Sequence, residues 1–352
     1  MTHPALQTRL CALAGVRYPI VQTGMGWVAG PRLVAATADA GGLGILASAT
    51  MDFRQLADAI AEVRSRTSAP FGVNLRADQP DAADRADLLV KEGVRVASFA
   101  MAPRRELVQR LKDGGVVVIP SIGAKRHAEK VAEWGVDAVI VQGGEGGGHT
   151  GAVPTSLLLP QVVDTVDIPV IAAGGFFDGR GLVAALAYGA SGIAMGTRFL
   201  LTKDSTVPDA VKQVYLSKSV NDTVVTKQVD GWPHRVLRSE FVEHLERTGA
   251  VSSVPRAVKN AVAFKRLSGT SWADIVREGL AMKRSQELSW SQVVMAANTP
   301  MLLKAAMVDG RPDLGVMASG QVVGLIDELP TVAELITRIR REAEDVLERL
   351  GA

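Results

Sequence analysis

Short runs of apolar, mostly β-branched residues alternate with longer segments of helical periodicity through the first 200 residues of this chain. Apolar runs bounded by glycine, proline and polar residues predict buried strands, whereas apolar positions three and four residues apart predict helices. The predicted strands are Tyr18–Thr23, Leu43–Ala47, Pro70–Leu75, Val94–Phe99, Val116–Pro120, Ala138–Val141, Ile168–Ala173 and Gly192–Met195. The predicted helices are Pro31–Ala40, Phe53–Arg66, Ala82–Lys91, Arg104–Lys112, Lys125–Glu133, one that ends within Pro160–Thr165, and Gly179–Tyr188.

This alternation predicts an α/β fold with a parallel sheet, because near-continuous apolar strands need helices over them. Eight strand–helix units within about 200 residues favour a (β/α)8 TIM barrel. An open, doubly wound sheet is the alternative. Asp52 is the expected N-cap of the helix Phe53–Arg66.

The alternation stops after the eighth predicted strand. We expect residues 1–200 to form the barrel and residues 201–311 to form a helical, lid-like insertion over its mouth, since so long a connection is unusual. This insertion carries Trp232, Trp272 and Trp290. Residues 312–352 would return to the barrel through Gly315–Gly324 and add a last helix, Val332–Leu350, with Thr331 as its cap.

The composition excludes several classes of protein. The formal net charge is +2 and no run of Lys and Arg occurs, so nucleic acid is not an expected partner. A lone cysteine, Cys11, excludes an intrachain disulfide and a cysteine metal cluster, which suits the cytoplasm. Met1–Arg9 has no apolar signal segment, and no apolar run of about 18 residues predicts a membrane span. We expect a soluble, cytoplasmic protein, either monomeric or a homo-oligomer.

The stretch Val136–Gly151 carries the most informative polar residues. Its strand runs into Gln142 and then into a glycine-rich loop that contains Glu145 and His149. Active sites of such barrels lie at the carboxyl ends of the strands, and glycines let the backbone approach a ligand closely. The alternative is an ordinary surface turn with a solvated histidine. The G-x-G-x-x-G spacing of Gly146–Gly151 is not followed by a helix, so it is weak support for a dinucleotide fold.

Other predicted strand ends complete a pocket. Gly174-Gly175 and Gly196-Thr197 follow the seventh and eighth strands, where phosphate commonly binds in this fold. Gly24-Met25-Gly26 offers backbone edges, and Asn74 and Gln142 are amides that could pair with a heterocycle. Together these residues favour a phosphorylated planar cofactor, and flavin mononucleotide (FMN) fits best. No spacing of metal ligands occurs, so no metal site is expected.

Five motifs resemble the nitronate monooxygenase family of FMN-dependent barrels: Val21–Gly26, Gly72–Leu75, Gln142–Gly151, Ile171–Gly175 and Met195–Phe199. The resemblance implies that His149 is the catalytic histidine and that Glu145 acts directly or orients the loop. It also implies FMN contacts at Gly24, Met25, Gly26, Asn74, Gln142, Gly147, Gly174, Gly175, Gly196 and Thr197. One departure is Gly146, where the family commonly has alanine.

The long form of the chain, with Ala297–Met301 (A-N-T-P-M), is similar to the branch of this family that dehydrogenates a hydroxy-indane acyl-CoA in steroid-ring breakdown. This resemblance implies a CoA thioester as the substrate, His149 as the base, flavin N5 as the hydride acceptor and NAD as a candidate electron acceptor. A nitronate monooxygenase and a non-catalytic flavin-binding sensor or scaffold are the alternatives. A CoA substrate would need basic residues at the rim, for which the candidates are His234, Arg235, Arg238, Lys259, Lys265 and Arg266.

Overall fold

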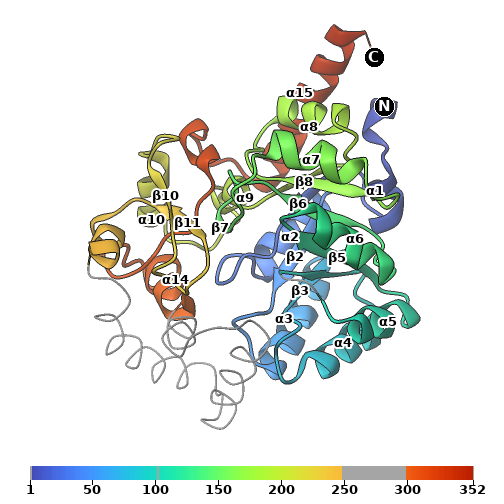
Figure 1. The fold of residues 1–352 in the computed structure, drawn as a ribbon, viewed down its shortest axis with the longest axis horizontal. Helices are drawn as coiled ribbons and strands as arrows, with labels where there is room; N and C mark the ends of the chain where they lie inside the picture. The colour runs from blue at the N-terminus through green and yellow to red at the C-terminus, as the bar shows by residue number, and fades with distance from the viewer. Residues whose placement is uncertain (1, 101–102, 248–298, 352) are drawn as a thin grey trace.

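The computed structural model describes residues 2–100, 103–247 and 299–351, and it contains a closed barrel of eight parallel strands (Figure 1). The strands, in barrel order, are β1 (Ile20–Gln22), β2 (Leu43–Ala47), β3 (Gly72–Leu75), β4 (Val96–Phe99), β5 (Val117–Ile122), β6 (Val139–Gln142), β8 (Val170–Ala173) and β9 (Ile193–Met195). Strand β1 pairs with β2 on one side and with β9 on the other. The (β/α)8 prediction is confirmed, and the open sheet is excluded.

Helices connect and surround these strands. They are α1 (Arg9–Ala14), α2 (Pro31–Asp39), α3 (Phe53–Arg66), α4 (Ala82–Lys91), α5 (Arg105–Asp113), α6 (Lys125–Glu133), α7 (Thr155–Val163), α8 (Gly179–Ala187) and α9 (Thr197–Leu200). Helix α3 begins as expected, because Asp52 Oδ1 accepts the Gln55 N–H at 2.7 Å and Gln55 Oε1 accepts the Asp52 N–H at 3.0 Å. Such a capping box satisfies two backbone donors that the helix itself leaves unpaired.

The predicted boundaries of the barrel strands lie within two residues of the observed ones, and the end of the fifth strand is one of those that differ by two. Strand β5 continues past Pro120 to Ile122. Pro120 still aligns with Phe99 of β4, while Ser121 and Ile122 pair with β6 on the other side. A proline lacks only its own N–H, so the strand can continue where the next neighbour takes over the pairing.

The side-chain alternation of the strands determines what faces the inside of the barrel. Val21, Ile45, Ile140 and Ile171 belong to the inner apolar cluster, whereas their strand neighbours pack outward against the helices. Successive side chains of a strand point to opposite faces. Gln142 follows Ile140 by two residues, so it continues the inward-facing row at the end where the apolar filling stops.

The insertion was expected to be helical or irregular, but it also contains strands. Strands β10 (Thr223–Thr226) and β11 (His234–Leu237) form an antiparallel sheet with β7 (Gly148–His149), in the order β10-β11-β7. Helices α10 (Asp209–Leu216) and α14 (Thr299–Met307) accompany this sheet on the side away from the outer barrel helices (Figure 1). The strands are short, and the second partner of β11, strand β7, lies 85 residues earlier in the chain, so local periodicity does not reveal them. Trp272 and Trp290 lie outside the described residues.

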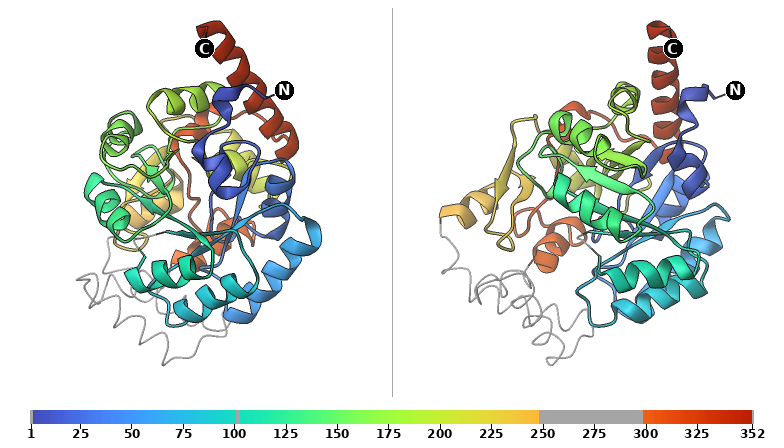
Figure 2. Two further views of the ribbon diagram at one scale, coloured as in Figure 1. Left: turned by 90° about the vertical axis from the view of Figure 1, so that its right-hand side faces the viewer. Right: turned by 45° about the vertical axis from the view of Figure 1, so that its right-hand side comes forward.

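The C-terminal segment returns through a 3-10 turn (Gln321–Leu325) and helix α15 (Val332–Leu350), which packs on α8 and α2. Gly179 of α8 allows the close approach, because a Cβ there would lie 2.4 Å from the Ala343 nitrogen. The two chain ends lie near each other beside α15 (Figure 2). Within the described ranges, no helix combines the length and the apolar character that crossing a membrane requires.

Candidate active site

A cavity of about 410 Å3 lies where the barrel strands end. All ten positions at which the sequence predicted cofactor contacts line it, and so do Glu145, His149 and His234. The insertion contributes Asp230 and Trp232 between β10 and β11, and α14 contributes Pro300 and Leu303. The cavity therefore has a glycine-rich floor on the barrel and a wall from the insertion.

The loop after β8 provides unpaired backbone donors. Gly174 and Gly175 have φ angles of +98° and +83°, which favour glycine. Their N–H groups have no acceptor among the residues described here. Thr197 Oγ1 accepts the Gly320 N–H at 3.0 Å, so the hydroxyl can still donate its own hydrogen. Backbone N–H groups and a hydroxyl facing one cavity are what a phosphate group needs.

The two inward-facing amides differ in their roles. Asn74 Nδ2 donates to Ser98 Oγ at 3.2 Å, and the loop after β1 crosses it closely, because a Cβ on Gly24 would lie 2.5 Å from the Asn74 Cβ. Gln142 Nε2 instead donates to the His149 carbonyl at 2.7 Å. Gln142 therefore holds the glycine-rich loop after β6 and offers only its oxygen to a ligand, whereas the sequence suggested recognition of a heterocycle by both groups of the amide.

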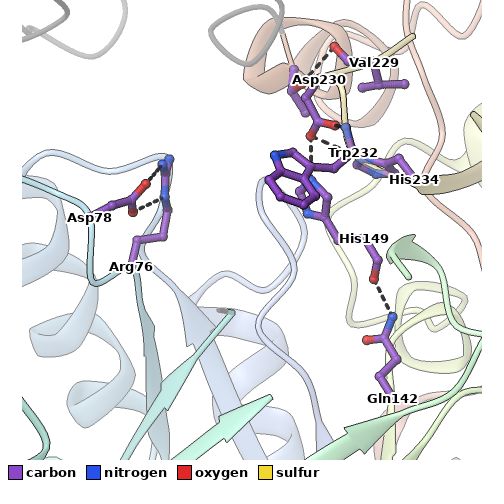
Figure 3. Close-up of polar contacts among 9 residues, drawn as sticks. Arg76, Asp78, Gln142, His149, Val229, Asp230, Trp232 and His234 are labelled. Carbon is purple, nitrogen blue, oxygen red and sulfur yellow. Dashed lines mark hydrogen bonds and ion pairs between the residues drawn. The ribbon is translucent and has the colours of Figure 1, made fainter. Parts of the chain in front are cut away.

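His149 lies on β7 and is held by the insertion. Its backbone pairs with that of His234 on β11, and its Nε2 lies 2.6 Å from Asp230 Oδ2 (Figure 3). The two imidazole rings are 4.7 Å apart. The His149 side chain is 56% exposed, whereas that of Asp230 is 6% exposed. An exposed imidazole with a buried carboxylate behind it is an arrangement suited to proton transfer.

The charges of this cluster follow from its burial and contacts. Burial alone raises the pKa of Asp230, but the hydrogen bond with His149 and the nearby charges of the two imidazoles outweigh burial and hold that pKa well below its ordinary value. Burial lowers the pKa of His234, which the nearby Asp230 only partly offsets. His234 Nδ1 lies 3.7 Å from Asp230 Oδ2, too far for a hydrogen bond. At neutral pH, Asp230 is thus ionised and His234 is neutral.

One ligand atom from each of His149, Asp230 and His234 could be shared by a metal ion, since these atoms all lie within 4.8 Å of one another. The sequence spacing does not reveal this grouping. Two ligands of a tetrahedral zinc ion would lie about 3.3 Å apart. The direct 2.6 Å contact between His149 and Asp230 fits a hydrogen-bonded pair better.

Comparison with known proteins gives the chain its family. A sequence profile of the nitronate monooxygenase family matches residues 7–90 and 85–342. The chain belongs to the nitronate monooxygenase family. This membership confirms the family inferred from the sequence motifs.

Two family relatives and one solved structure cover nearly the whole chain. A protein of Rhodococcus jostii (strain RHA1), named (3aS,4S,5R,7aS)-5-hydroxy-7a-methyl-1-oxo-octahydro-1H-indene-4-carboxyl-CoA dehydrogenase, is 62% identical over 347 residues, which are 99% of this chain and 98% of that protein. A protein of the same name from Mycobacterium tuberculosis (strain ATCC 25618 / H37Rv) is 62% identical over 350 residues, 99% of each. FabK from Thermotoga maritima is similar in structure, with a TM-score of 0.83, 35% identity and 98% coverage of both chains. The chain is an oxidoreductase of this family.

The structure gives a physical reason for the glycine at position 146. A Cβ at Gly146 would lie 2.7 Å from Nε2 of Gln142 and 2.8 Å from its Cδ. The missing side chain lets Gln142 bend beneath the loop and reach the His149 carbonyl. In this member of the family, the loop geometry depends on Gly146 and Gln142 together.

Glu145 holds the glycine-rich loop after β6 to the start of α7. Its carboxylate accepts the Thr155 N–H at 2.9 Å and the Thr155 hydroxyl at 2.7 Å. Its backbone carbonyl accepts the Gln321 N–H at 3.0 Å. Of the two roles expected for Glu145, these contacts favour orientation of the loop over direct proton transfer.

The predicted basic rim is arranged differently from the expectation. Arg235 donates to the Gly144 carbonyl at 2.9 Å and to Thr223 Oγ1 at 2.9 Å, and neither Arg235 nor Arg238 lines the cavity. Burial lowers the pKa of Arg235, which Glu145 partly offsets. Arg235 therefore supports the glycine-rich loop after β6. Lys259, Lys265 and Arg266 lie outside the described residues.

The sequence reasoning missed Asp230, Trp232 and an ion pair across the cavity, Arg76 and Asp78 (Figure 3). Arg76 Nη2 lies 2.6 Å from Asp78 Oδ2, and Arg76 is the one Arg or Lys among the described lining residues. A signal was available for Arg76, because it follows the inward-facing Asn74 by two residues. No comparable signal links Asp230 or Trp232 to the barrel.

Proposed function

We propose that the chain is an FMN-dependent dehydrogenase of a bulky, bicyclic hydroxyacyl-CoA thioester of the indane type. The observation that carries the proposal is the 62% identity over 99% of the chain to a dehydrogenase of that class. A cavity that combines glycine-rich loops with His149 and its carboxylate partner is consistent with this chemistry. Identity of this degree over the full length is stronger evidence for a shared substrate class than the fold alone would be, because one fold hosts many activities.

The residues of the cavity fit FMN. Gly174, Gly175 and Thr197 would hold its phosphate through backbone N–H groups and a hydroxyl, and Asn74 and Gln142 would meet the ring system. When bound, FMN supplies the hydride acceptor at its N5 atom. Leu303 of α14 and Trp232 of the insertion provide apolar surface for a bicyclic acyl group.

His149 takes the proton that the substrate loses together with the hydride. The proton comes from the hydroxyl if a carbonyl forms, or from the carbon next to the thioester if a carbon–carbon double bond forms. A neutral imidazole has a nitrogen lone pair, so it can accept this proton and later release it to water. Arg76 at the cavity wall is placed to meet an anionic group of CoA.

Anaerobic mixing of the FMN-loaded protein with a hydroxy-indane acyl-CoA tests the proposal. We expect loss of the oxidised-flavin absorbance, with free CoA as the control that causes none. Deuterium at the hydroxyl-bearing carbon or at the carbon next to the thioester identifies the bond that breaks, because only the reacting position slows the reduction. Absence of bleaching by the thioester would refute the proposed function.

A nitronate monooxygenase is the second candidate, favoured by the family profile itself. Here His149 would take a proton from a small nitroalkane, or the reaction would start from the alkyl nitronate. Rapid bleaching by propyl nitronate with O2-dependent turnover, and none by the thioester, would support this candidate.

We further propose that NAD is the oxidant that restores the flavin and that the protein is located in the cytoplasm. That the protein forms a homo-oligomer stays a prediction.

A further inference from the structure

We propose that Asp230 is the positioning residue of His149: it binds the Nε2–H of the imidazole and leaves Nδ1 as the atom that accepts the proton of the substrate. The inference rests on the proposed function insofar as His149 is the base. It adds Asp230 of the insertion, which lies 81 positions after His149 in the chain, to the catalytic machinery of the barrel.

The Asp230 carboxylate is itself held in place. Oδ2 makes the 2.6 Å contact with His149 Nε2, and Oδ1 accepts the Trp232 N–H at 3.1 Å. The turn that carries Asp230 leads directly into β11, whose His234 pairs with His149 through the backbone. Both ends of the contact are therefore fixed to the same small sheet (Figure 3).

The geometry selects one tautomer of His149. An ionised carboxylate can only accept hydrogen bonds, so the neutral imidazole must carry its hydrogen on Nε2. Nδ1 then has a lone pair, and it has no hydrogen-bond partner among the described residues, while the half-exposed ring lines the cavity. When Nδ1 takes a proton, the positive charge that forms on the ring is paired with Asp230. A carboxylate behind a histidine does the same in serine hydrolases.

A purely structural role explains Asp230 less well. The backbone pairing of β7 with β11 already anchors the loop, and the Gln142 amide holds the His149 carbonyl. A buried carboxylate destabilises a fold unless its charge is matched. Asp230 and His234 are the titratable side chains that contact His149 in the described structure, and His234 is neutral. The negative charge of Asp230 is thus matched when His149 is protonated, because the two side chains then form an ion pair.

Nitrogen NMR of the FMN-loaded protein with 15N-labelled histidine tests the tautomer without any turnover, and the His149→Ala spectrum assigns the signal. We expect a protonated Nε2 and an unprotonated Nδ1 in the wild type, and a mixture of tautomers in Asp230→Asn. We also expect Asp230→Asn to slow flavin reduction by the thioester about 10²- to 10⁴-fold, with the dissociation constant of the thioester nearly unchanged. The pH of half-maximal reduction should fall, because the imidazolium has lost its carboxylate.

Asp222→Asn makes the same chemical change at an exposed turn before β10, and it should behave as wild type in both measurements. A wild-type His149 protonated on Nδ1 would overturn the proposal even if Asp230→Asn does not fold. An Asp230→Asn protein with the wild-type rate and pH profile would overturn it while the proposed function stands. If the thioester does not reduce the wild-type flavin, the proposed function fails, and the tautomer alone decides the role of Asp230.

Discussion

Gly146→Ala adds one methyl group beneath the glycine-rich loop after β6 and should weaken the hydrogen bond that holds the His149 backbone. The new Cβ would lie 2.7 to 2.8 Å from the Nε2, Cδ and Cγ atoms of Gln142, so that side chain must move. Its 2.7 Å hydrogen bond to the His149 carbonyl would then be lost. Such a bond contributes about 0.5–1.5 kcal/mol. If all of it acts in the transition state, flavin reduction slows about 2- to 13-fold.

Stopped-flow reduction of the bound flavin measures this effect, and Gly151→Ala is the matched control in the same loop. A Cβ at Gly151 meets its nearest atom, the Gly123 carbonyl, at 3.6 Å, an ordinary contact. In a Gln142→Ala background, Gly146→Ala should have no further effect, because nothing remains for the methyl group to displace. The reasoning is refuted if Gly146→Ala reduces flavin at the wild-type rate, or if it is equally harmful without the Gln142 side chain.

Three further predictions concern the base, the rim and the buried histidine. His149→Ala should retain FMN but slow flavin reduction about 10²- to 10⁴-fold; unchanged kinetics would remove His149 from the mechanism. Arg76→Ala should raise the dissociation constant of the thioester about two- to fivefold, measured by flavin spectral titration, whereas Arg311→Ala, which breaks the same Arg-x-Asp pair outside the cavity, should not. Burial lowers the pKa of His234 below the ordinary value of 6.5, so below about pH 6.5 the histidine is protonated in the unfolded chain before it is protonated in the folded chain. The contribution of neutral His234 to the free energy of unfolding is therefore present above about pH 6.5 and decreases as the pH drops. His234→Asn should flatten the melting temperature against pH in that range, and an unchanged slope would contradict the assignment.

The barrel and most of its ligand-facing positions could be predicted from the sequence because their signals are local. Helix Phe53–Arg66 begins at Asp52 as expected, since a cap and its helix are neighbours in the chain. Asn74 and Gln142 were identified because strand alternation and the ends of parallel strands place polar groups at one mouth.

The insertion was predicted poorly for the opposite reason. The pairing of β11 with β7 joins His234 to His149, 85 residues earlier, and no local pattern shows which distant segment completes such a sheet. The role of Arg235 was also hidden, because its guanidinium turns toward the Gly144 carbonyl and away from the cavity. The sequence shows that an arginine near a predicted site carries a positive charge, but it does not show which way the side chain points.

The sequence by itself determined the closed α/β barrel, the glycine-rich loops at its mouth and the histidine among them, because periodicity, turn residues and strand ends act over a few positions. Only the tertiary structure decided that Asp230 lies behind His149, that Gln142 holds the loop, and that Arg76 is the arginine that lines the cavity in the described part of the chain. These are contacts between side chains brought together by the closure of the barrel and the pairing of the insertion. The energies of these contacts depend on interatomic distances of a few ångströms, and such distances cannot be read from the order of residues along the chain.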